Sequence, residues 1–384
     1  MKIGILTQPL LNNYGGLLQN YALQQALIRL GHEPITIDQK PKDLPSWYVF
    51  LGRIKGMIMY LLSPEKHKRP KYSLNEKEKK IIEFNTKQFI ERSIIHTKEC
   101  VGAEEFRQEV LGRGIEALVV GSDQCWRPMY NNYIEDMFFQ FATSLPIKKR
   151  IAYAASFGTD QWEYTPELTR TCAELVRDYD LVTVRESSGI ELCKKYFGAD
   201  AKHVLDPTML LTREDYEMLI AQYEVNNSEG DMFNYILDPT QRKMDFINNA
   251  ATVLDLKPFQ VLPKYNEDHR TKKQVKNEIE SCVYPSPAKW VRAFMDSKMT
   301  VVDSFHGMVF SIIFNKPFWV IGNQERGMSR FISLLNLFGL SERLISEDNL
   351  AEVDLMKPID YENVNSVWRE KRNESLNYLK NALG

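Results

Sequence analysis

The sequence predicts an α/β protein with parallel sheets, and three observations support this prediction. Short runs of β-branched and apolar residues alternate with helical patterns, as in βαβ units. Polar residues follow several predicted strands at their carboxyl ends, where open α/β sheets bind ligands. A polar stretch at 212–231 separates two series of such elements and reads as a linker with a short helix. We therefore expect two units, 1–212 and 213–384.

The first unit opens with a βαβ pattern. A strand is predicted at 2–7, a helix with one apolar face ending near residue 30, and a second strand at 34–38. The loop between the first strand and the helix carries Asn13-Tyr14-Gly15-Gly16, whose glycines permit a tight turn and close approach of a ligand. Ordinary turn chemistry would explain the same residues. The loop lacks the G-x-G-x-x-G pattern, so we do not predict a dinucleotide site.

Further strands of the first unit are predicted at 117–120, 150–155 and 181–184, with a helix at about 166–178. Polar clusters follow these strands at 121–124, 156–158 and 185–188. In the last cluster, Arg185 precedes two serines that can cap a helix and could bind a phosphate or carboxylate bidentately. An ion pair with Glu186 or another acid would explain Arg185 equally well.

The second unit repeats the alternation. Strands are predicted at 233–237, 259–262, 300–302 and 317–321, with helices at about 241–255 and 286–297. An apolar helical run follows the strand at 300–302, and another helix is predicted around 331–338. A polar-rich helix from about residue 360 ends the chain and could pack back on the first unit. No internal repeat is apparent in the sequence.

His306 has the most informative position in the second unit. It follows a buried strand, Asp303 and Ser304, which can cap the next helix. The carboxyl end of a strand beside a helix N-terminus favours anion binding, and a histidine there can exchange protons near neutral pH. A capping or packing histidine is the alternative, but this position favours a functional role.

Composition excludes several classes of protein. The 384 residues carry a net charge of −2, which gives no indication of nucleic-acid binding. The five cysteines are scattered and the six histidines lack metal-ligand spacing, so neither a disulfide framework nor a zinc site is predicted. Neither a signal peptide nor a transmembrane run is found, and we expect a cytoplasmic protein.

One segment suggests contact with a membrane surface. Residues 48–62 are mostly apolar, and residues 65–80 carry seven Lys or Arg against three Glu. Such a pair of segments can lie on an anionic membrane, at the inner face for a cytoplasmic protein. The alternative is a helix packed on its own domain, followed by a solvated linker.

Other motifs were weighed and set aside. Asp178-Tyr179-Asp180 matches the D-x-D pattern that some glycosyltransferases use to hold a metal, but three-residue patterns recur by chance. Neither a G-x-S-x-G elbow nor a phosphate-binding G-K-[ST] loop is present.

The chain resembles the polysaccharide pyruvyl transferase family. The resemblance runs through an ordered set of blocks: NNYGGLLQNYALQQAL (12–27), VVGSDQCWRP (119–128), AYAASFG (152–158), VTVRESSG (182–189), HVLDPTMLL (203–211), VVDSFHGMVFSIIFNKPF (301–318) and RGMSRFISLL (326–335). It implies two Rossmann-like domains with the active site in the cleft between them, as in type B glycosyltransferases. It also implies transfer of a pyruvyl group from phosphoenolpyruvate onto two hydroxyls of one sugar, releasing phosphate.

The resemblance also suggests roles for residues. His306 matches the family's key histidine and would be the acid and base, and Arg185 matches an arginine that would bind the donor. Arg326 and Arg330 are our candidates for a second anion clamp. Many relatives have an arginine where this chain has Ser304, so a donor contact is missing or supplied elsewhere. Asn13, Gly15 and Asp123 would face the sugar, on the first unit, which we expect to bind the acceptor. The full set of expected substrate-binding residues is Asn13, Tyr14, Gly15, Gly16, Asp123, Gln124, Ser156, Ser304, Arg326 and Arg330.

The sequence thus predicts a ketal pyruvyltransferase of capsule or exopolysaccharide assembly that needs no metal or other cofactor. Its acceptor could be lipid-linked, which would give a purpose to a membrane contact through residues 48–80. Two alternatives remain open: a nucleotide-sugar glycosyltransferase or epimerase on the same frame, and a sugar- or anion-binding protein without catalysis. Release of phosphate from phosphoenolpyruvate would distinguish the pyruvyltransferase from the nucleotide-sugar enzyme and from the binding protein.

Overall fold

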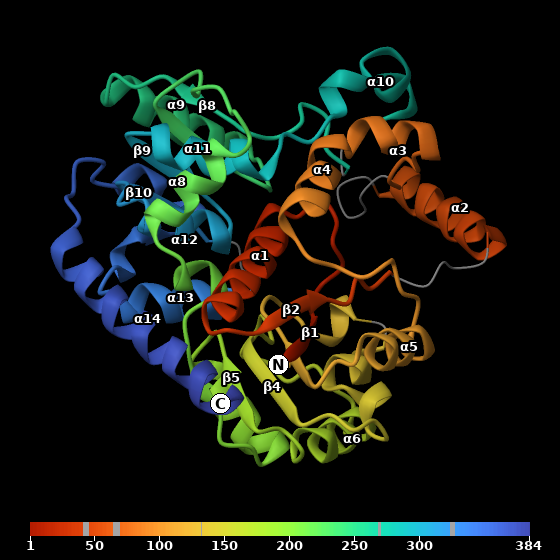
Figure 1. Ribbon diagram of the computed structural model, residues 1–384. Coiled ribbons are helices and arrows are strands. Elements are labelled where there is room, and N and C mark those ends of the chain that lie inside the picture. The colour runs from red at the N-terminus through yellow and green to blue at the C-terminus, as the bar shows by residue number, and fades with distance from the viewer. Residues whose placement is uncertain (41–45, 64–69, 132, 268–269, 323–326) are drawn as a thin grey trace.

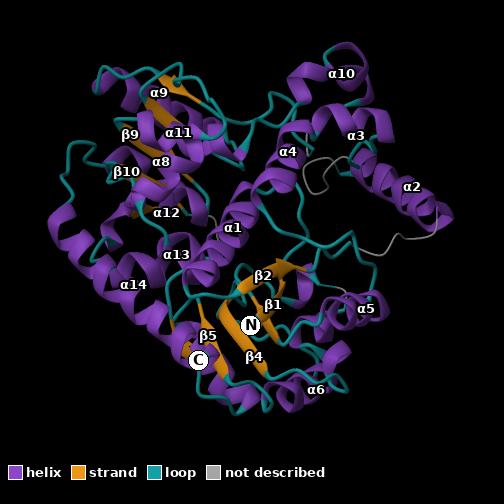
Figure 2. Cartoon of the chain, in the orientation of Figure 1, coloured by secondary structure: helices purple, strands orange, loops and turns teal. Residues whose placement is uncertain are grey.

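The computed structural model describes residues 1–40, 46–63, 70–131, 133–267, 270–322 and 327–384 (Figure 1). Within them the chain forms two parallel sheets flanked by helices, each the core of a Rossmann-like domain. Figure 2 shows the strands of the lower sheet lying between helices. The predicted α/β class with two Rossmann-like domains is confirmed.

The first sheet has the order β2-β1-β3-β4-β5-β6, and every neighbouring pair is parallel. Its central strands are buried on both faces, which is why they read as continuous apolar runs. The strands are β1 (Lys2–Leu6), β2 (Glu33–Thr36), β3 (Ala117–Val120), β4 (Lys149–Ala155), β5 (Leu181–Val184) and β6 (Lys202–His203). The helices of this half of the chain are α1 (Tyr14–Arg29), α2 (Ser46–Leu62), α3 (Glu76–Ile82), α4 (Phe84–Ser93), α5 (Ala103–Arg113), α6 (Pro166–Val176) and α7 (Ser188–Leu192).

The second sheet has the order β11-β10-β9-β7-β8, again with parallel neighbours. Its strands are β7 (Met232–Tyr235), β8 (Pro258–Phe259), β9 (Met299–Val302), β10 (Phe318–Ile321) and β11 (Leu344–Ile345). The helices of this half of the chain are α8 (Arg213–Ala221), α9 (Gln241–Val253), α10 (Lys272–Asn277), α11 (Pro287–Asp296), α12 (Phe305–Ile313), α13 (Ser329–Leu337) and α14 (Tyr361–Leu383).

The two sheets share one topology that the sequence does not reveal. Numbered within each domain, the strand order is second, first, third, fourth, fifth in both sheets, and the first sheet adds a sixth strand after the fifth. The order therefore reverses between β1 and β3 in one domain and between β7 and β9 in the other. Open α/β sheets bind ligands at the carboxyl ends of the strands that flank such a switch point. Both switch points therefore mark where to look for a site.

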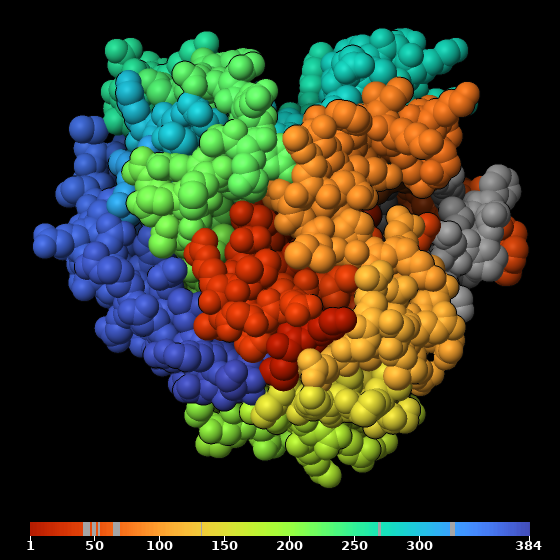
Figure 3. Space-filling model, in the orientation of Figure 1, coloured from red at the N-terminus to blue at the C-terminus, as the bar shows by residue number. Residues whose placement is uncertain are grey.

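Two helices tie the domains together. Helix α1 belongs to the first domain, yet its Leu17 and Leu18 share one buried cluster with Trp290 and Phe310 of the second. Helix α14 returns to the first domain, where Trp368 Nε1 donates to the Met209 carbonyl at 2.8 Å. Figure 3 shows the N-terminal segment, in red, packed between the blue C-terminal helix and the orange segment that follows α1.

Candidate functional site

The end of β9 is fixed by a buried carboxylate. Asp303 is fully buried and accepts hydrogen bonds from the backbone N–H groups of Leu237 at 2.7 Å and Asp238 at 3.0 Å. Lys243 of α9 balances its charge, with Nζ 3.1 Å from Asp303 Oδ2. These contacts hold the loop after β7 against the end of β9, so both sides of the second switch point are rigidly joined.

Helix α12 begins directly after this anchor. Ser304 is its N-cap, with the hydroxyl oxygen accepting from the Gly307 N–H at 3.0 Å. Ser304, a predicted substrate-binding residue, therefore has a capping role in this structure. His306 lies in the first turn of α12, where the partial positive charge of the helix is concentrated.

His306 faces the first domain. A Cβ atom built on Gly15, in the first turn of α1, would lie only 2.1 Å from Nδ1 of His306. The other ring nitrogen, Nε2, lies 3.6 Å from Oδ2 of Asp206, which is ion-pair range but beyond hydrogen-bond length. The imidazole is thus held between two residues of the other domain, and its side chain is 10% exposed.

Asp206 is a carboxylate that sequence reasoning missed as a site residue. Asp206 is 1% exposed. Its Oδ1 accepts two hydrogen bonds from Thr208, one from the backbone N–H at 3.0 Å and one from the hydroxyl Oγ1 at 2.7 Å. Its Oδ2 accepts from Arg185 Nη1 at 2.9 Å. Burial alone would raise the pKa of Asp206, but His306, Arg185 and Thr208 lower that pKa well below its usual range. The signal was available, because Asp206 follows the last strand of the first sheet, β6, within the block at 203–211.

Arg185 joins two acids. Its Nη1 donates to Asp206, its Nη2 donates to Asp123 Oδ1 at 3.2 Å, and its guanidinium lies 4.4 Å from the centre of the Phe305 ring. Burial works against the charge of Arg185, but Asp123 and Asp206 raise its pKa above the ordinary value. The side chain is 1% exposed, so Arg185 is an internal cation between acids. The sequence left two alternatives for Arg185, anion binding and an ion pair. The ion pair is observed, with acids other than Glu186.

Asp123 stands at the first switch point. It follows β3 with a φ of 68°, a left-handed conformation that aims its side chain at Arg185. Burial would raise the pKa of Asp123, but Arg185, His306 and Arg330 lower it. Asp123 and His306 therefore bring the two switch points to one place between the domains.

Arg330 of α13 is the second cation of this cluster. It is 7% exposed and lies 5.8 Å from the centre of the Phe305 ring, on which Arg185 also packs. Burial and the nearby Arg185 lower the pKa of Arg330 to about 10, so it remains charged at neutral pH. The cluster of His306, Asp206, Arg185, Asp123 and Arg330 is hereafter called the interdomain cluster.

Other predicted residues serve the scaffold around the cluster. Asn13 caps α1 by accepting from the Gly16 N–H at 3.2 Å, and the buried Tyr14 ring packs 5.9 Å from that of Trp290. Ser156 donates to Glu186 Oε1 at 3.0 Å, and Gln124 accepts from Arg127 at 3.1 Å. Arg326 lies outside the described residues.

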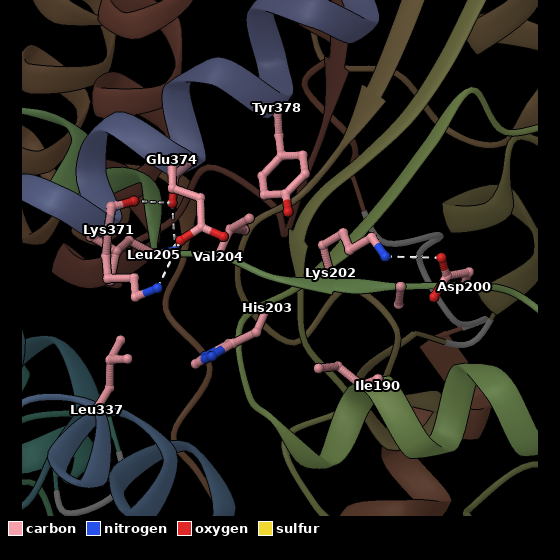
Figure 4. Close-up of a pocket in the computed structure, with 12 residues that line it drawn as sticks. Ile190, Asp200, Lys202, His203, Val204, Leu205, Leu337, Lys371, Glu374 and Tyr378 are labelled. Carbon is pink, nitrogen blue, oxygen red and sulfur yellow. Dashed lines mark hydrogen bonds and ion pairs between the residues drawn. The ribbon is translucent and has the colours of Figure 1, made fainter.

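Behind Arg185, His203 supports the backbone. Its Nε2 lies 3.0 Å from the Arg185 carbonyl and 3.3 Å from Ser333 Oγ, which links the first domain to α13. His203 borders a cavity of about 390 Å³ between β6 and α14, where Lys371 and Glu374 form an ion pair at 2.8 Å (Figure 4). No residue of the interdomain cluster lines this cavity.

A second cavity, of about 430 Å³, lies in the first domain beside the loops after β2 and β3. Its lining includes Gln39, Tyr130, Tyr133 and Asp136, with Tyr130 50% and Tyr133 58% exposed. The lining residue Asn131 donates to the Gln124 and Cys125 carbonyls, so the cavity adjoins the loop after β3 that carries Asp123. Burial raises the pKa of Asp136 to about 6. We call this cavity the tyrosine cavity.

The D-x-D segment has a structural role. Asp180 pairs with Lys149 at 2.9 Å and accepts from the Arg150 N–H at 2.9 Å, at the opposite, amino ends of β4 and β5.

The model of the family described as polysaccharide pyruvyl transferase matches residues 13–325, a span that includes His306, Arg185, Asp206 and Asp123. The chain belongs to the polysaccharide pyruvyl transferase family. It is therefore a member of a transferase family of polysaccharide biosynthesis. No curated protein matches the chain.

Solved structures share the fold at low sequence identity. UGT89C1 of Arabidopsis thaliana, complexed with UDP-L-rhamnose, matches with a TM-score of 0.51 and 8% identity over 98% of each chain. The UDP-GlcNAc 2-epimerase of Methanocaldococcus jannaschii matches with a TM-score of 0.48 and 13% identity, covering 98% of this chain and 99% of that one. At such identities the likeness to UGT89C1 shows the fold alone: two Rossmann-like domains, as in type B glycosyltransferases.

Proposed function

We propose that the protein transfers the pyruvyl group of phosphoenolpyruvate onto two hydroxyls of one sugar, with His306 as acid and base. The observation that carries this proposal is the contact of His306 Nε2 with Asp206 Oδ2 at 3.6 Å, where the two switch points meet. A neighbouring carboxylate fixes the orientation of an imidazole that exchanges protons as an acid and base. The reaction requires such an acid, because the enol carbon becomes electrophilic only when the methylene carbon gains a proton.

The proposed steps balance in atoms and charge. The His306 imidazolium gives a proton to the methylene carbon of phosphoenolpyruvate, and the first sugar hydroxyl adds to the adjacent carbon, returning a proton to His306. The carbon–oxygen bond to phosphate then breaks, and the second hydroxyl adds to the same carbon. The proton of the second hydroxyl leaves with the phosphate, which departs as hydrogen phosphate. Asp206 holds the imidazole throughout and stabilises its charge.

For the anionic donor, we propose Arg330 as the direct contact and Arg185 as a positioning residue. Arg185 already donates to Asp206 and Asp123, and both carboxylates lower its capacity to attract a further anion. Arg330 remains charged, and its guanidinium lies beside the same Phe305 ring. Arginine suits this task because its planar fork matches phosphate and carboxylate oxygens.

For the acceptor sugar, we propose the tyrosine cavity of the first domain. The faces of exposed Tyr130 and Tyr133 can cover the apolar C–H side of a sugar ring, while Gln39 and Asp136 can bind its hydroxyls. The cavity adjoins the loop that carries Asp123, so a sugar bound there would lie near the interdomain cluster. Roles in capsule or exopolysaccharide assembly, and a lipid-linked form of the acceptor, belong to the same proposal.

The test measures release of phosphate from phosphoenolpyruvate by phosphorus-31 NMR. A panel of p-nitrophenyl hexopyranosides serves as acceptors. We expect phosphate release that depends on one sugar, together with a sugar product that mass spectrometry identifies as the pyruvyl ketal. His306→Ala should lower the rate about 10²–10⁴-fold, the usual contribution of general acid–base catalysis. His32→Ala, in the turn between α1 and β2, is the matched control and should keep the rate. Turnover of a UDP-sugar with phosphoenolpyruvate left intact would overturn the proposal.

A further inference from the structure

Helix α2 presents a stripe of exposed apolar side chains. Its members recur every three or four residues and so share one face of the helix. Their exposed fractions range from 43% to 73%, values that core residues do not show. The stripe consists of Trp47, Leu51, Ile54, Ile58, Leu61 and Leu62.

The opposite face of α2 packs on the protein's own chain. A Cβ built on Gly56 would lie 3.1 Å from the ring of Pro70, and Tyr60, four residues further, is only partly exposed. Helical spacing places Gly56 and Tyr60 about 140–180° around the helix from Ile58 and Trp47. The stripe therefore lies on the side of α2 away from this contact, and an exposed apolar patch of this kind marks an interaction surface.

Basic residues border the stripe. Helix α2 carries Lys55 on the side next to Leu51 and contains neither Asp nor Glu. Met57, beside the stripe, lines a cavity of about 250 Å³ together with Arg270 and Lys272. Lys272 begins α10, which also carries Lys273 and Lys276, and among the described residues these three lysines form no ion pair.

We propose that α2 docks the protein onto an anionic lipid surface, lying in the interface with its apolar stripe in the lipid and the α10 lysines near the headgroups. Apolar side chains flanked by cations are the features that bind interfacial helices to anionic membranes. Helix α2 has 17 residues, and no described helix is long and apolar enough to cross a bilayer. A second copy of the chain fits the stripe less well, since stable dimers usually bring about 20–30 residues from each partner.

The position of α2 suits this role. Figure 1 shows α2 at the edge of the molecule beside α3, far from α12, the helix that carries His306. A membrane contact through α2 would therefore leave the interdomain cluster uncovered. The inference goes beyond the proposed reaction and is tested without it.

The experiment is co-sedimentation of the full chain with vesicles of phosphatidylcholine alone and of phosphatidylcholine with phosphatidylglycerol. We expect binding to the anionic vesicles that weakens with salt. The triple variant L51S/I58S/L61S should bind at least tenfold more weakly. The control L111S/M218S/V253S removes three equally exposed apolar side chains from α5, α8 and α9 and should bind as the wild type does.

The lysines are tested separately. Replacing Lys272, Lys273 and Lys276 by Gln should weaken binding to anionic vesicles about fivefold for each lysine removed. Trp47 provides a direct probe, because it is exposed whereas Trp126 and Trp290 are fully buried. Its fluorescence should shift to the blue with anionic vesicles, and W47F should lose that shift.

Three results would overturn the inference. The first is that the wild type does not bind vesicles. The second and third are that L51S/I58S/L61S, with unchanged thermal unfolding, or the lysine variant binds anionic vesicles as tightly as the wild type does. Analytical ultracentrifugation adds a fourth. If the wild type is a dimer that L51S/I58S/L61S converts into monomers, the occupant of the stripe is a second copy of the chain.

Discussion

Gly15 and His306 come from different domains, yet the α-carbon of Gly15 lies directly against the imidazole ring of His306. A Cβ at position 15 would meet Nδ1 at 2.1 Å and Cγ at 2.4 Å, closer than nonbonded atoms approach. Both residues lie in the first turn of the helix that follows a switch-point strand, α1 in one domain and α12 in the other. The placement of His306 therefore depends on the docking of the domains, and on glycine at this position.

The first prediction is that Gly15→Ala displaces His306. The new methyl group must move either the ring or the domain interface, because the atoms it meets belong to a buried side chain. We expect loss of turnover comparable to that of His306→Ala and a loss of about 1–3 kcal/mol in the free energy of unfolding, typical of overpacking. Phosphate release and urea unfolding measure the two effects.

Gly16→Ala is the matched control for this prediction. A Cβ at position 16 would meet the side chain of Asn13 at 3.3 Å, a tight contact that Asn13 can relieve by a small shift. We expect most of the turnover to remain. Equal activity of the two alanine variants would contradict the proposed contact.

The second prediction separates two roles for Arg185. If Arg185 positions Asp206 and Asp123, Arg185→Ala leaves two buried carboxylates without their cation and costs about 3–5 kcal/mol in unfolding free energy. Arg185→Lys should recover part of that stability, because the charge is kept while the bidentate geometry is lost. Donor affinity, measured by calorimetry, should fall more in Arg330→Gln than in Arg185→Lys. The reverse order would identify Arg185 as the direct donor contact.

The third prediction concerns acid stability. The pKa of Asp206 is lower in the folded protein than the value of about 3.9 expected when unfolded. Its contribution to stability is therefore complete above about pH 5 and is lost as the pH falls through 4 toward the lower folded pKa. We expect Asp206→Asn to unfold more easily at pH 7 by about 3 kcal/mol, with the difference shrinking in acid.

Asp200→Asn is the control for this pH dependence. Asp200 pairs with Lys202 on the surface at 2.9 Å, and both side chains are exposed to solvent. Removing such a pair should change stability little at any pH. A constant difference between Asp206→Asn and the wild type from pH 7 to pH 3 would contradict the account of Asp206.

The sequence predicted the positions of several candidate site residues, because those positions depend on local patterns. His306 at the end of β9, Asp123 after β3 and Arg185 after β5 were placed correctly, because polar residues after buried strands share one edge of a parallel sheet. Most strands were predicted within one or two residues, because the central strands of both sheets are buried on both faces and read as apolar runs.

What the sequence could not predict depends on pairing across long distances. Asp206 and His306 are one hundred positions apart, and only the docking of the two domains brings them together. The shared strand order of the two sheets is likewise invisible, because it is a property of topology and not of residue identity. Tyr14 illustrates the opposite case: a residue placed in the substrate-binding set lies buried against Trp290, because its position on α1 faces the second domain.

The fourth prediction tests the tyrosine cavity as the acceptor site. Tyr133 is 58% exposed, so its loss should leave the fold intact. If its ring covers one face of the sugar, Tyr133→Ala should raise the KM for the acceptor about tenfold with kcat nearly unchanged, as expected for uniform binding. Tyr133→Phe keeps the ring and should behave as the wild type does. A change in the KM for phosphoenolpyruvate instead would place the donor in this cavity.

The fifth prediction uses the pH dependence of the same cavity. Burial raises the pKa of Asp136 to about 6, so this carboxyl gains its charge as the pH rises through that value. A carboxylate accepts hydrogen bonds from sugar hydroxyls more strongly than a neutral carboxyl group does. The KM of the wild type for the acceptor should therefore fall as the pH rises from 5 to 7. In Asp136→Asn the KM for the acceptor should not change with pH. The turnover of this variant should keep the wild-type pH dependence, which other residues of the site determine. If the KM of Asp136→Asn follows the wild-type curve, Asp136 does not contact the sugar, and the acceptor must bind to other residues of the cavity.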